Sequence, residues 1–199
     1  MAVVNYGVGN LRSIRRGLEK SGADVKITHS PTDLLSSDAI VLPGVGAFAP
    51  AVQNMTPIAD VVAEAMKNGK PILGVCLGLQ LLFTRSSEGG SVKGLDFISG
   101  DIVKLPDAVK TPQMGWNTLN IEQSHPMLDG VKDGSYVYFV HSYYPKPIDS
   151  DVVVATTEYG VRFASMVAKR NLLATQFHPE KSSKTGLMML KNFVRIVKR

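Results

Sequence analysis

Residues Pro71-Ile72-Leu73-Gly74-Val75-Cys76-Leu77-Gly78-Leu79-Gln80-Leu81-Leu82-Phe83 join two apolar runs through a G-x-C-x-G turn. The first run predicts a buried strand over Ile72–Val75, and the second predicts a helix over Leu79–Phe83. A sharp turn between strand and helix needs glycine on both sides, because neighbouring side chains would clash. The stretch therefore predicts a nucleophile elbow, which presents Cys76 at the end of a strand and directs a helix N-terminus at it.

The residues before this stretch alternate strand-like and helix-like segments. Short apolar runs predict strands at Ala2–Asn5, Val25–Thr28 and Ala39–Leu42, and helical spacing predicts helices at Leu11–Lys20 and Ile58–Asn68. Such alternation indicates βαβ units and a parallel sheet. Ligands of parallel sheets bind at the carboxyl ends of the strands, so the loops after the first, third and fourth strands are the candidate site.

The second half lacks long helices between its strands. Strand-like runs cover Ile98–Leu105, Trp116–Glu122, Tyr136–Tyr143, Val152–Thr157, Ser165–Val167 and Leu172–Gln176. A closing helix is predicted over Lys184–Val197. We therefore expect a single α/β domain over residues 1–199, with three layers and antiparallel strands added to a mostly parallel central sheet.

Composition narrows the class of protein. The 199 residues are 44% hydrophobic and 20% charged, which is typical of a globular domain. The formal net charge is +5, but Lys and Arg are scattered, so no nucleic-acid footprint is expected. A single cysteine excludes an internal disulfide. The first residues do not resemble a signal peptide and no apolar run could span a bilayer, so no membrane association and a cytoplasmic location are expected.

Cys76 has two possible roles. A free cysteine is more often a small buried core residue than a nucleophile. The only cysteine of the chain, placed in G-x-C-x-G between a strand and a helix, favours the nucleophile. The following helix favours the thiolate, and the Leu77 N–H is placed to donate to an oxyanion.

A cysteine nucleophile needs a histidine base and a group that orients it. The chain has four histidines, which are His29, His125, His141 and His178. His178 is favoured because Glu180 follows two residues later, across a turn that Pro179 stiffens. His141 ends a strand and remains a second candidate on chemistry alone. The histidines are dispersed, so no metal site is predicted.

Several motifs together resemble a known family. They are Tyr6-Gly7-Val8-Gly9-Asn10-Leu11, Pro43-Gly44-Val45-Gly46-Ala47-Phe48, Cys76-Leu77-Gly78-Leu79-Gln80-Leu81-Leu82-Phe83, Met114-Gly115-Trp116-Asn117 and His178-Pro179-Glu180-Lys181-Ser182-Ser183. In this order they resemble the class I (triad-type) glutamine amidotransferases, and within that class the glutaminase subunits of imidazole glycerol phosphate synthase. The resemblance spans the chain from Asn5 to the terminal helix and implies the flavodoxin-like fold of that class. Asn5 departs from it, because the family often has an acidic residue there.

The resemblance implies a mechanism. Cys76 attacks the side-chain amide of glutamine, His178 passes its proton to the leaving ammonia, and Glu180 orients His178. A glutamyl thioester forms and water releases glutamate. The backbone N–H groups of Val45 and Leu77 form the oxyanion hole, and the peptide that carries the first donor must reorient.

The resemblance also implies binding residues. Glutamine is surrounded by Gly44, Gly46, Gln80, Glu88, Ser142 and Tyr143, with Glu88 pairing with the substrate ammonium. Asn10, Trp116 and Lys181 resemble contacts with a partner, a cyclase (βα)8-barrel subunit through which ammonia travels. Together the two subunits convert a phosphoribulosyl formimino intermediate to imidazole glycerol phosphate and an aminoimidazole carboxamide ribotide, in histidine biosynthesis. No cofactor is implied, and glutaminase activity is expected to be low until the partner binds its ligand.

Other interpretations stay open. The residues alone leave Gln80 as a polar helix residue, Glu88 and Lys181 as solvated charges, and Trp116 as core. Gly44–Ala49 also fits the G-x-G-x-x-A pattern of dinucleotide sites, which we disfavour because no helix start is clear there. Glutaminases of anthranilate or pyridoxal phosphate synthases, a self-sufficient cysteine hydrolase and a non-catalytic interaction module are the competing functions.

Overall fold

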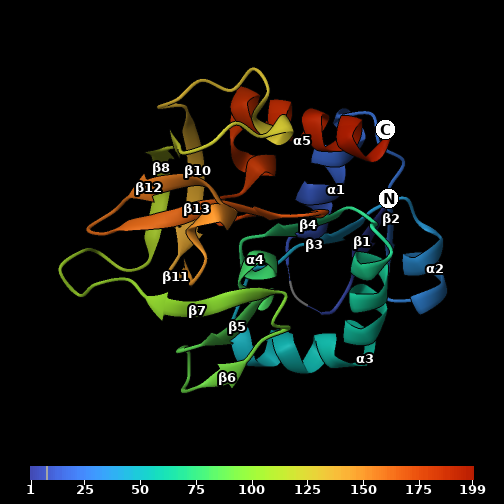
Figure 1. Ribbon diagram of the computed structural model, residues 1–199, viewed down its shortest axis with the longest axis horizontal. Helices are drawn as coiled ribbons and strands as arrows, with labels where there is room; N and C mark the ends of the chain where they lie inside the picture. Colours follow the sequence, from blue (N-terminus) through green and yellow to red (C-terminus); the bar gives the residue numbers. More distant parts are fainter. Residues whose placement is uncertain (8) are drawn as a thin grey trace.

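The computed structural model in Figure 1 describes residues 1–7 and 9–199 of the chain. Val8, which belongs to the first motif quoted above, lies outside the described residues. Among the residues that are described, no helix is long and apolar enough to cross a membrane.

An eight-stranded sheet occupies the centre, in the order β2-β1-β3-β4-β14-β13-β12-β9. Its strands are β1 (Ala2–Val4), β2 (Lys26–Thr28), β3 (Ile40–Leu42), β4 (Ile72–Val75), β9 (Asn120–Ile121), β12 (Val153–Glu158), β13 (Arg162–Lys169) and β14 (Leu172–Thr175). The pairs from β2 to β14 are parallel, and β13, β12 and β9 continue the sheet in antiparallel pairing. The predicted mostly parallel sheet with an antiparallel extension is confirmed.

Helices cover both faces of this sheet and complete three layers (Figure 1). They are α1 (Leu11–Lys20), α2 (Pro31–Ser36), α3 (Phe48–Lys67), α4 (Leu77–Leu81) and α5 (Ser183–Val197). Side chains alternate between the faces of a strand, so Val3 packs in one hydrophobic cluster with α1 and α5, and Val4 packs in the other with α2, α3 and α4. The continuous apolar runs of the parallel strands follow from burial on both faces.

Not all later strands join the central sheet, which corrects the expectation for the second half. β8 (Gln113–Thr118) pairs with β10 (Tyr136–His141), and a four-stranded sheet has the order β11-β7-β5-β6. The latter strands are β5 (Phe83–Ser86), β6 (Val92–Lys93), β7 (Ile98–Lys104) and β11 (Tyr143–Pro147). The run predicted as one strand over Tyr136–Tyr143 breaks at Ser142, because the chain leaves its pairing with β8 there and begins its pairing with β7.

The helix predictions need three corrections. The helix predicted over Ile58–Asn68 begins ten residues earlier, at Phe48, and contains Pro57. Phe48, Ala51 and Met55 are buried on its inner face. This packing keeps the residues before Pro57 helical, although proline disfavours the helical turn that precedes it. The segment after Cys76 forms a helix of only five residues, and Phe83 already belongs to β5. The short helix α2 was not predicted.

Candidate active site

The backbone at Cys76 has the conformation that a nucleophile elbow requires. Its φ is +54° and its ψ is −107°, a region in which non-glycine residues cost about 1–3 kcal/mol. A Cβ at Gly78 would lie 1.8 Å from the Leu42 carbonyl oxygen, and a Cβ at Gly74 would lie 3.0 Å from both the Gly78 carbonyl oxygen and the Leu79 nitrogen. Glycine is therefore required on both sides of Cys76, as the sequence predicts.

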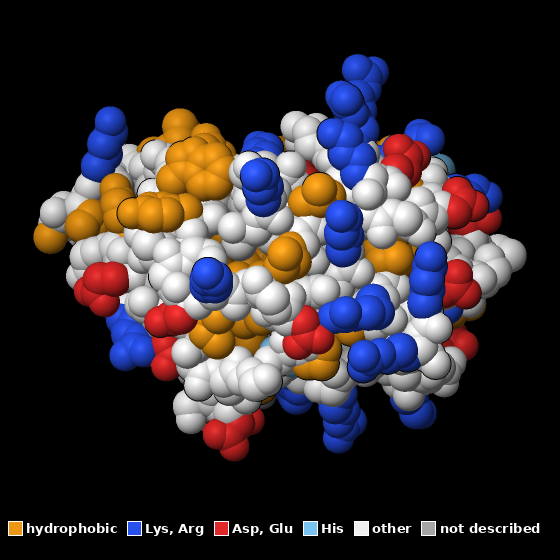
Figure 2. All heavy atoms as spheres, turned by 90° about the horizontal axis from the view of Figure 1, so that it is seen from above, with side chains coloured by type: hydrophobic (Ala, Val, Ile, Leu, Met, Phe, Trp, Pro, Cys, Tyr) orange, Lys and Arg blue, Asp and Glu red, His pale blue; other side chains and the backbone are white. Residues whose placement is uncertain are grey.

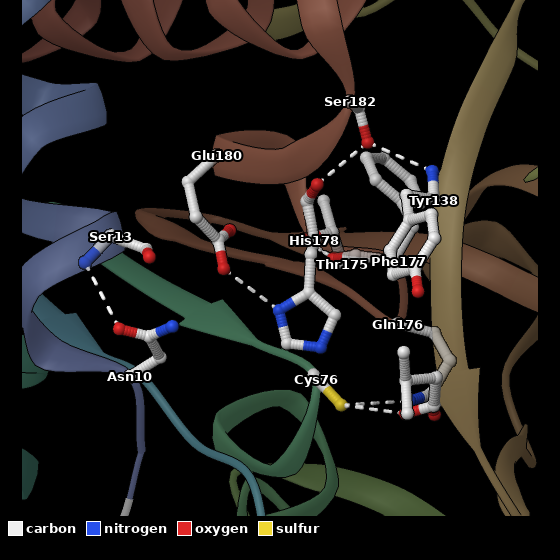
Figure 3. Close-up of polar contacts among 11 residues, drawn as sticks. Asn10, Ser13, Cys76, Tyr138, Thr175, Gln176, Phe177, His178, Glu180 and Ser182 are labelled. Atoms are coloured by element: carbon white, nitrogen blue, oxygen red, sulfur yellow. Dashed lines mark hydrogen bonds and ion pairs between the residues drawn. The ribbon is translucent and has the colours of Figure 1, made fainter. Parts of the chain in front are cut away.

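The pairing of β14 with β4 brings the end of the chain to Cys76. The Cys76 N–H donates to the Thr175 carbonyl oxygen over 2.7 Å. His178 follows three residues later and lies between Cys76 and Glu180 in Figure 3. Cys76 and His178, which are far apart in the sequence, thus meet because two parallel strands end at the same edge of the sheet.

His178 and Glu180 form a buried pair. His178 Nδ1 lies 2.8 Å from Glu180 Oε1, and the two side chains are 2% and 3% exposed. Burial alone would lower the pKa of His178, but the neighbouring Cys76 and Glu180 outweigh it and raise that pKa to about 10. Within the described residues, His178 Nε2 and Glu180 Oε2 have no hydrogen-bond partner. Nδ1–H therefore donates to the carboxylate and Nε2 is left for the sulfur and for a substrate.

Backbone contacts hold the His178 ring in place. The His178 N–H donates to the Tyr138 carbonyl oxygen over 2.9 Å. Ser182 Oγ donates to the His178 carbonyl oxygen over 2.6 Å and accepts from the Tyr138 N–H over 2.9 Å. Strand β10 and the turn around Pro179 are thus fixed to each other (Figure 3).

A pocket of about 230 Å³ opens at Cys76. Its lining comprises Val45, Gly46, Cys76, Leu77, Gln80, Glu88, Pro112, Val140, His141, Ser142 and Tyr143. The structure therefore brings together all the residues that the sequence predicts for glutamine and the oxyanion, apart from Gly44. Gly44 lies directly beneath, because a Cβ there would be 2.6 Å from the Leu77 Cβ.

The loop from Pro43 to Gly46, which is the predicted oxyanion strand, is held at its start by Tyr6. Gly46 has a φ of +123°, and the Tyr6 hydroxyl donates to the Pro43 carbonyl oxygen. Burial, and then the charge of Cys76, raise the pKa of Tyr6 well above its usual range, so that it remains a donor. Leu77 is the first residue of α4, and its N–H has no acceptor within that helix.

Glu88 is tied to the start of α3. Its Oε2 accepts from the Phe48 N–H over 3.1 Å. Burial raises the pKa of Glu88, and this hydrogen bond partly offsets the effect. Glu88 is therefore a pocket carboxylate with a backbone partner and not a solvated loop charge.

His141 is excluded as the base. Its Nδ1 lies 2.9 Å from the Tyr143 carbonyl oxygen, and its Nε2 lies 2.9 Å from the side-chain amide of Gln113. Burial lowers its pKa to about 4, so that it is neutral. Both nitrogens are engaged, so His141 shapes the pocket wall. In the part of the chain that the structure describes, no group of three or more His, Cys, Asp or Glu side chains could hold a metal ion.

The residues predicted to contact a partner lie on another face. Trp116 is 52% exposed, so it is not core, and its ring lies 5.8 Å from that of Tyr138 in an edge-on arrangement. Lys181 Nζ lies 6.0 Å from the centroid of the same tyrosine ring. Asn10 is exposed and caps α1, because its side chain accepts from the Ser13 N–H over 3.2 Å.

One buried polar residue at the site was missed by the sequence reasoning. Gln176, which is fully buried, has its Nε2 3.7 Å from Cys76 Sγ. Its only sequence signal is its place between a strand end and His178. That signal becomes informative only once β14 is known to lie beside β4.

Comparison with known proteins agrees with this fold. The family model described as glutamine amidotransferase class-I matches residues 2–197. A solved structure of a glutamine amidotransferase superimposes with a TM-score of 0.78 at 17% identity, covering 100% of this chain and 99% of that one. A structure of PurLQS from Thermotoga maritima gives 0.76 at 20% identity, covering 98% and 97%. At these identities the structures support the fold alone.

Relatives of higher identity narrow the family. The imidazole glycerol phosphate synthase subunit HisH of Archaeoglobus fulgidus is 50% identical over 200 residues, covering all of both chains. The subunit of the same name from Natronomonas pharaonis is 48% identical over 201 residues, covering 98% of this chain and 93% of that one. The chain belongs to the class I glutamine amidotransferases and, within them, to the HisH subunits of imidazole glycerol phosphate synthase.

Proposed function

We propose that this chain hydrolyses glutamine at Cys76 and supplies the ammonia to a cyclase subunit with a (βα)8 barrel. The observation that carries the proposal is the position of Cys76. It lies on a strained elbow, in a pocket whose far wall holds the Glu88 carboxylate, with the His178–Glu180 pair beside it. A nucleophile, a base with its orienting group and an anionic partner for an amino acid are thus present together.

The residues divide the chemistry as follows. The Cys76 thiol gives its proton to His178 Nε2 and its sulfur forms a bond to the side-chain carbonyl carbon of glutamine, and the N–H groups of Val45 and Leu77 stabilise the resulting oxyanion. The carbon–nitrogen bond then breaks, and ammonia leaves with a proton from His178 Nε2. Water gives a proton to the same nitrogen and adds to the thioester carbon. The carbon–sulfur bond then breaks, which releases glutamate and restores Cys76. Glu180 keeps the His178 ring in the tautomer that allows both transfers.

Figure 2 shows the face that we propose for the partner. Apolar side chains gather on the left of this view, on the side of β8 and β10, where Met114, Trp116 and Tyr136 are 65%, 52% and 61% exposed. A cavity of about 590 Å³ lies behind Glu180 and is lined by Ser13, Arg16, Gly17, Lys20, Trp116, Pro179, Glu180, Lys181, Ser183, Lys184, Leu187 and Leu190. Glu180 lines this cavity and Cys76 lines the glutamine pocket, and we propose that ammonia leaves toward the cavity while glutamine enters the pocket.

The proposal for the acceptor rests on the relatives. They are named as imidazole glycerol phosphate synthase subunits. We propose that the ammonia completes the conversion of the phosphoribulosyl formimino intermediate to imidazole glycerol phosphate and the carboxamide ribotide. Asn10, Trp116 and Lys181 are proposed to contact the cyclase subunit.

Trapping the thioester tests the proposal. We expect acid quenching of the complex during glutamine turnover, followed by peptide mass spectrometry, to find a glutamyl group on Cys76. Cys76→Ala should lose the adduct and all glutamate release, while the complex of this variant still makes imidazole glycerol phosphate from added ammonium. An adduct on any other residue, or glutamate release by Cys76→Ala, would refute the assignment.

A further inference from the structure

We propose that Gln176 is a fourth catalytic residue, whose side-chain amide donates a hydrogen bond to the Cys76 thiolate. The inference deepens the proposed glutamine hydrolysis and rests on it. Gln176 has no surface exposure, and its Nε2 lies 3.7 Å from Cys76 Sγ, a contact drawn in Figure 3.

The direction of this hydrogen bond follows from the neighbouring groups. An amide nitrogen and oxygen are distinguished by their partners, and the Tyr143 carbonyl oxygen can only accept. The end of the Gln80 side chain that lies 3.0 Å from this oxygen is therefore its NH₂ group. The same NH₂ group lies 3.2 Å from the Gln176 side chain, which must present its oxygen there. The nitrogen of Gln176 is then the end that faces the sulfur.

The other contacts of Cys76 show why such a donor is needed. The sulfur lies 3.6 Å from the Val140 carbonyl oxygen, to which a thiol can donate but which disfavours a thiolate. Gln176 supplies an N–H donor, which favours the thiolate over the thiol. Gln80 holds the Gln176 side chain in the orientation that directs this donor at the sulfur. Since a buried charge without hydrogen bonds is costly, this donor stabilises the nucleophilic form.

The main chain fixes Gln176 equally firmly. Its N–H donates to the Ser165 carbonyl oxygen over 2.8 Å, and the residue directly follows β14. Gln176 and the attacking residue are thus held by neighbouring strand ends of one sheet. A buried glutamine that served packing alone would not need its amide nitrogen directed at the only cysteine of the chain.

Alkylation of Cys76 tests the proposal without any substrate. Because the chain has one cysteine, the rate of its reaction with iodoacetamide reports this thiol alone. Gln176→Met keeps the side-chain volume and removes the donor. We expect the pH midpoint of the alkylation rate to rise by about one unit in this variant.

Gln113→Met is the matched control. It removes a buried amide near the pocket, 2.9 Å from His141 Nε2, which makes no hydrogen bond to the sulfur among the residues that the structure describes. We expect it to leave the alkylation midpoint in place. Thermal unfolding of both variants checks that each is folded, and Gln176→Leu serves as a second variant if Gln176→Met is not.

Steady-state kinetics of the complex with the cyclase subunit add a second readout. Gln176→Met should lower kcat for glutamine about tenfold, because a hydrogen bond to the nucleophile is lost. An unchanged alkylation midpoint in a folded Gln176 variant would overturn the inference. If the midpoint shifts but the parent complex does not hydrolyse glutamine, the role of Gln176 stands and the proposed function fails.

Discussion

Gly78 illustrates how a single atom controls the elbow. An added Cβ would lie 1.8 Å from the Leu42 carbonyl oxygen, which belongs to the neighbouring strand and cannot move away. We expect Gly78→Ala to lower the free energy of unfolding by about 3 kcal/mol, measured by urea denaturation.

Gly69→Ala is the control for this prediction. Gly69 has a φ of +79° but nothing within 4 Å of an added Cβ, so alanine there carries only the backbone cost of about 1 kcal/mol. Equal losses in the two variants would show that the contact with Leu42 does not matter.

His141 makes the stability of the fold depend on pH. Burial lowers its folded-state pKa to about 4, below its usual value of 6.5. As the pH falls below 6.5, the unfolded chain binds a proton at His141 that the folded chain does not. The contribution of neutral His141 to the free energy of unfolding is therefore fully present above pH 6.5 and is lost as the pH falls from 6.5 toward 4. We expect this effect to lower the free energy of unfolding of the parent protein by about 2 kcal/mol when the pH is lowered from 7.5 to 5.

His141→Asn isolates that contribution, since asparagine can still donate to the Tyr143 carbonyl oxygen. We expect urea denaturation at the two pH values to show a smaller difference in the variant than in the parent. The same pH difference in both proteins would contradict the assignment of a neutral, buried His141.

At the scale of elements, α3 and the pocket share Glu88. Its carboxylate accepts from the Phe48 N–H at the start of α3, where Ala47 provides no side-chain cap. Glu88→Gln keeps an acceptor but removes the charge for the substrate ammonium, so KM for glutamine should rise about tenfold or more with little change in stability. Glu88→Ala should raise KM and also lower the free energy of unfolding by about 1 kcal/mol.

Asp60→Asn provides the comparison, because it removes an exposed carboxylate from the same helix. We expect the Asp60→Asn variant to keep the parent values of KM for glutamine and of the free energy of unfolding. If Glu88→Gln leaves KM at the parent value, Glu88 is only a helix anchor and the proposed ammonium contact is wrong.

The sequence predicts the parallel half of the fold well. Helix α1 and strand β4 have the bounds expected from their apolar spacing, because each is an isolated unit with clear end signals. The start of α3 was missed because Pro57 hides a continuous helix that tertiary packing retains. The break at Ser142 depends on which strands pair, and local spacing carries no such information.

The candidate site was likewise predictable where local sequence motifs mark its residues, and not where a role depends on strand pairing. Cys76 and His178 stand out through local motifs, and the structure places them together. Gln176 could not be found in this way, because its importance depends on β14 lying beside β4. The distance between those strands in the sequence gives no hint of their pairing.

At the scale of the whole molecule, the face around Trp116 is expected to bind the partner. Large exposed aromatic residues near the centre of an interface often contribute most of its affinity, so Trp116→Ala should weaken binding to the cyclase subunit about tenfold or more. Titration calorimetry measures the change. Ile148→Ala is the control, since Ile148 is 82% exposed and its N–H pairs with Ser99 of β7, whereas Trp116 belongs to β8. Equal effects of the two substitutions would place the interface elsewhere.

Glutamate release by the purified chain, alone and with the cyclase subunit and its phosphorylated ligand, measures both the activity of the Cys76 pocket and its activation by the partner. We expect little release by the chain alone, a large increase in the loaded complex, and none from Cys76→Ala in either state. Full activity of the chain alone would contradict activation by the partner. An absence of glutamate in every mixture would contradict the assignment of the Cys76 pocket to glutamine.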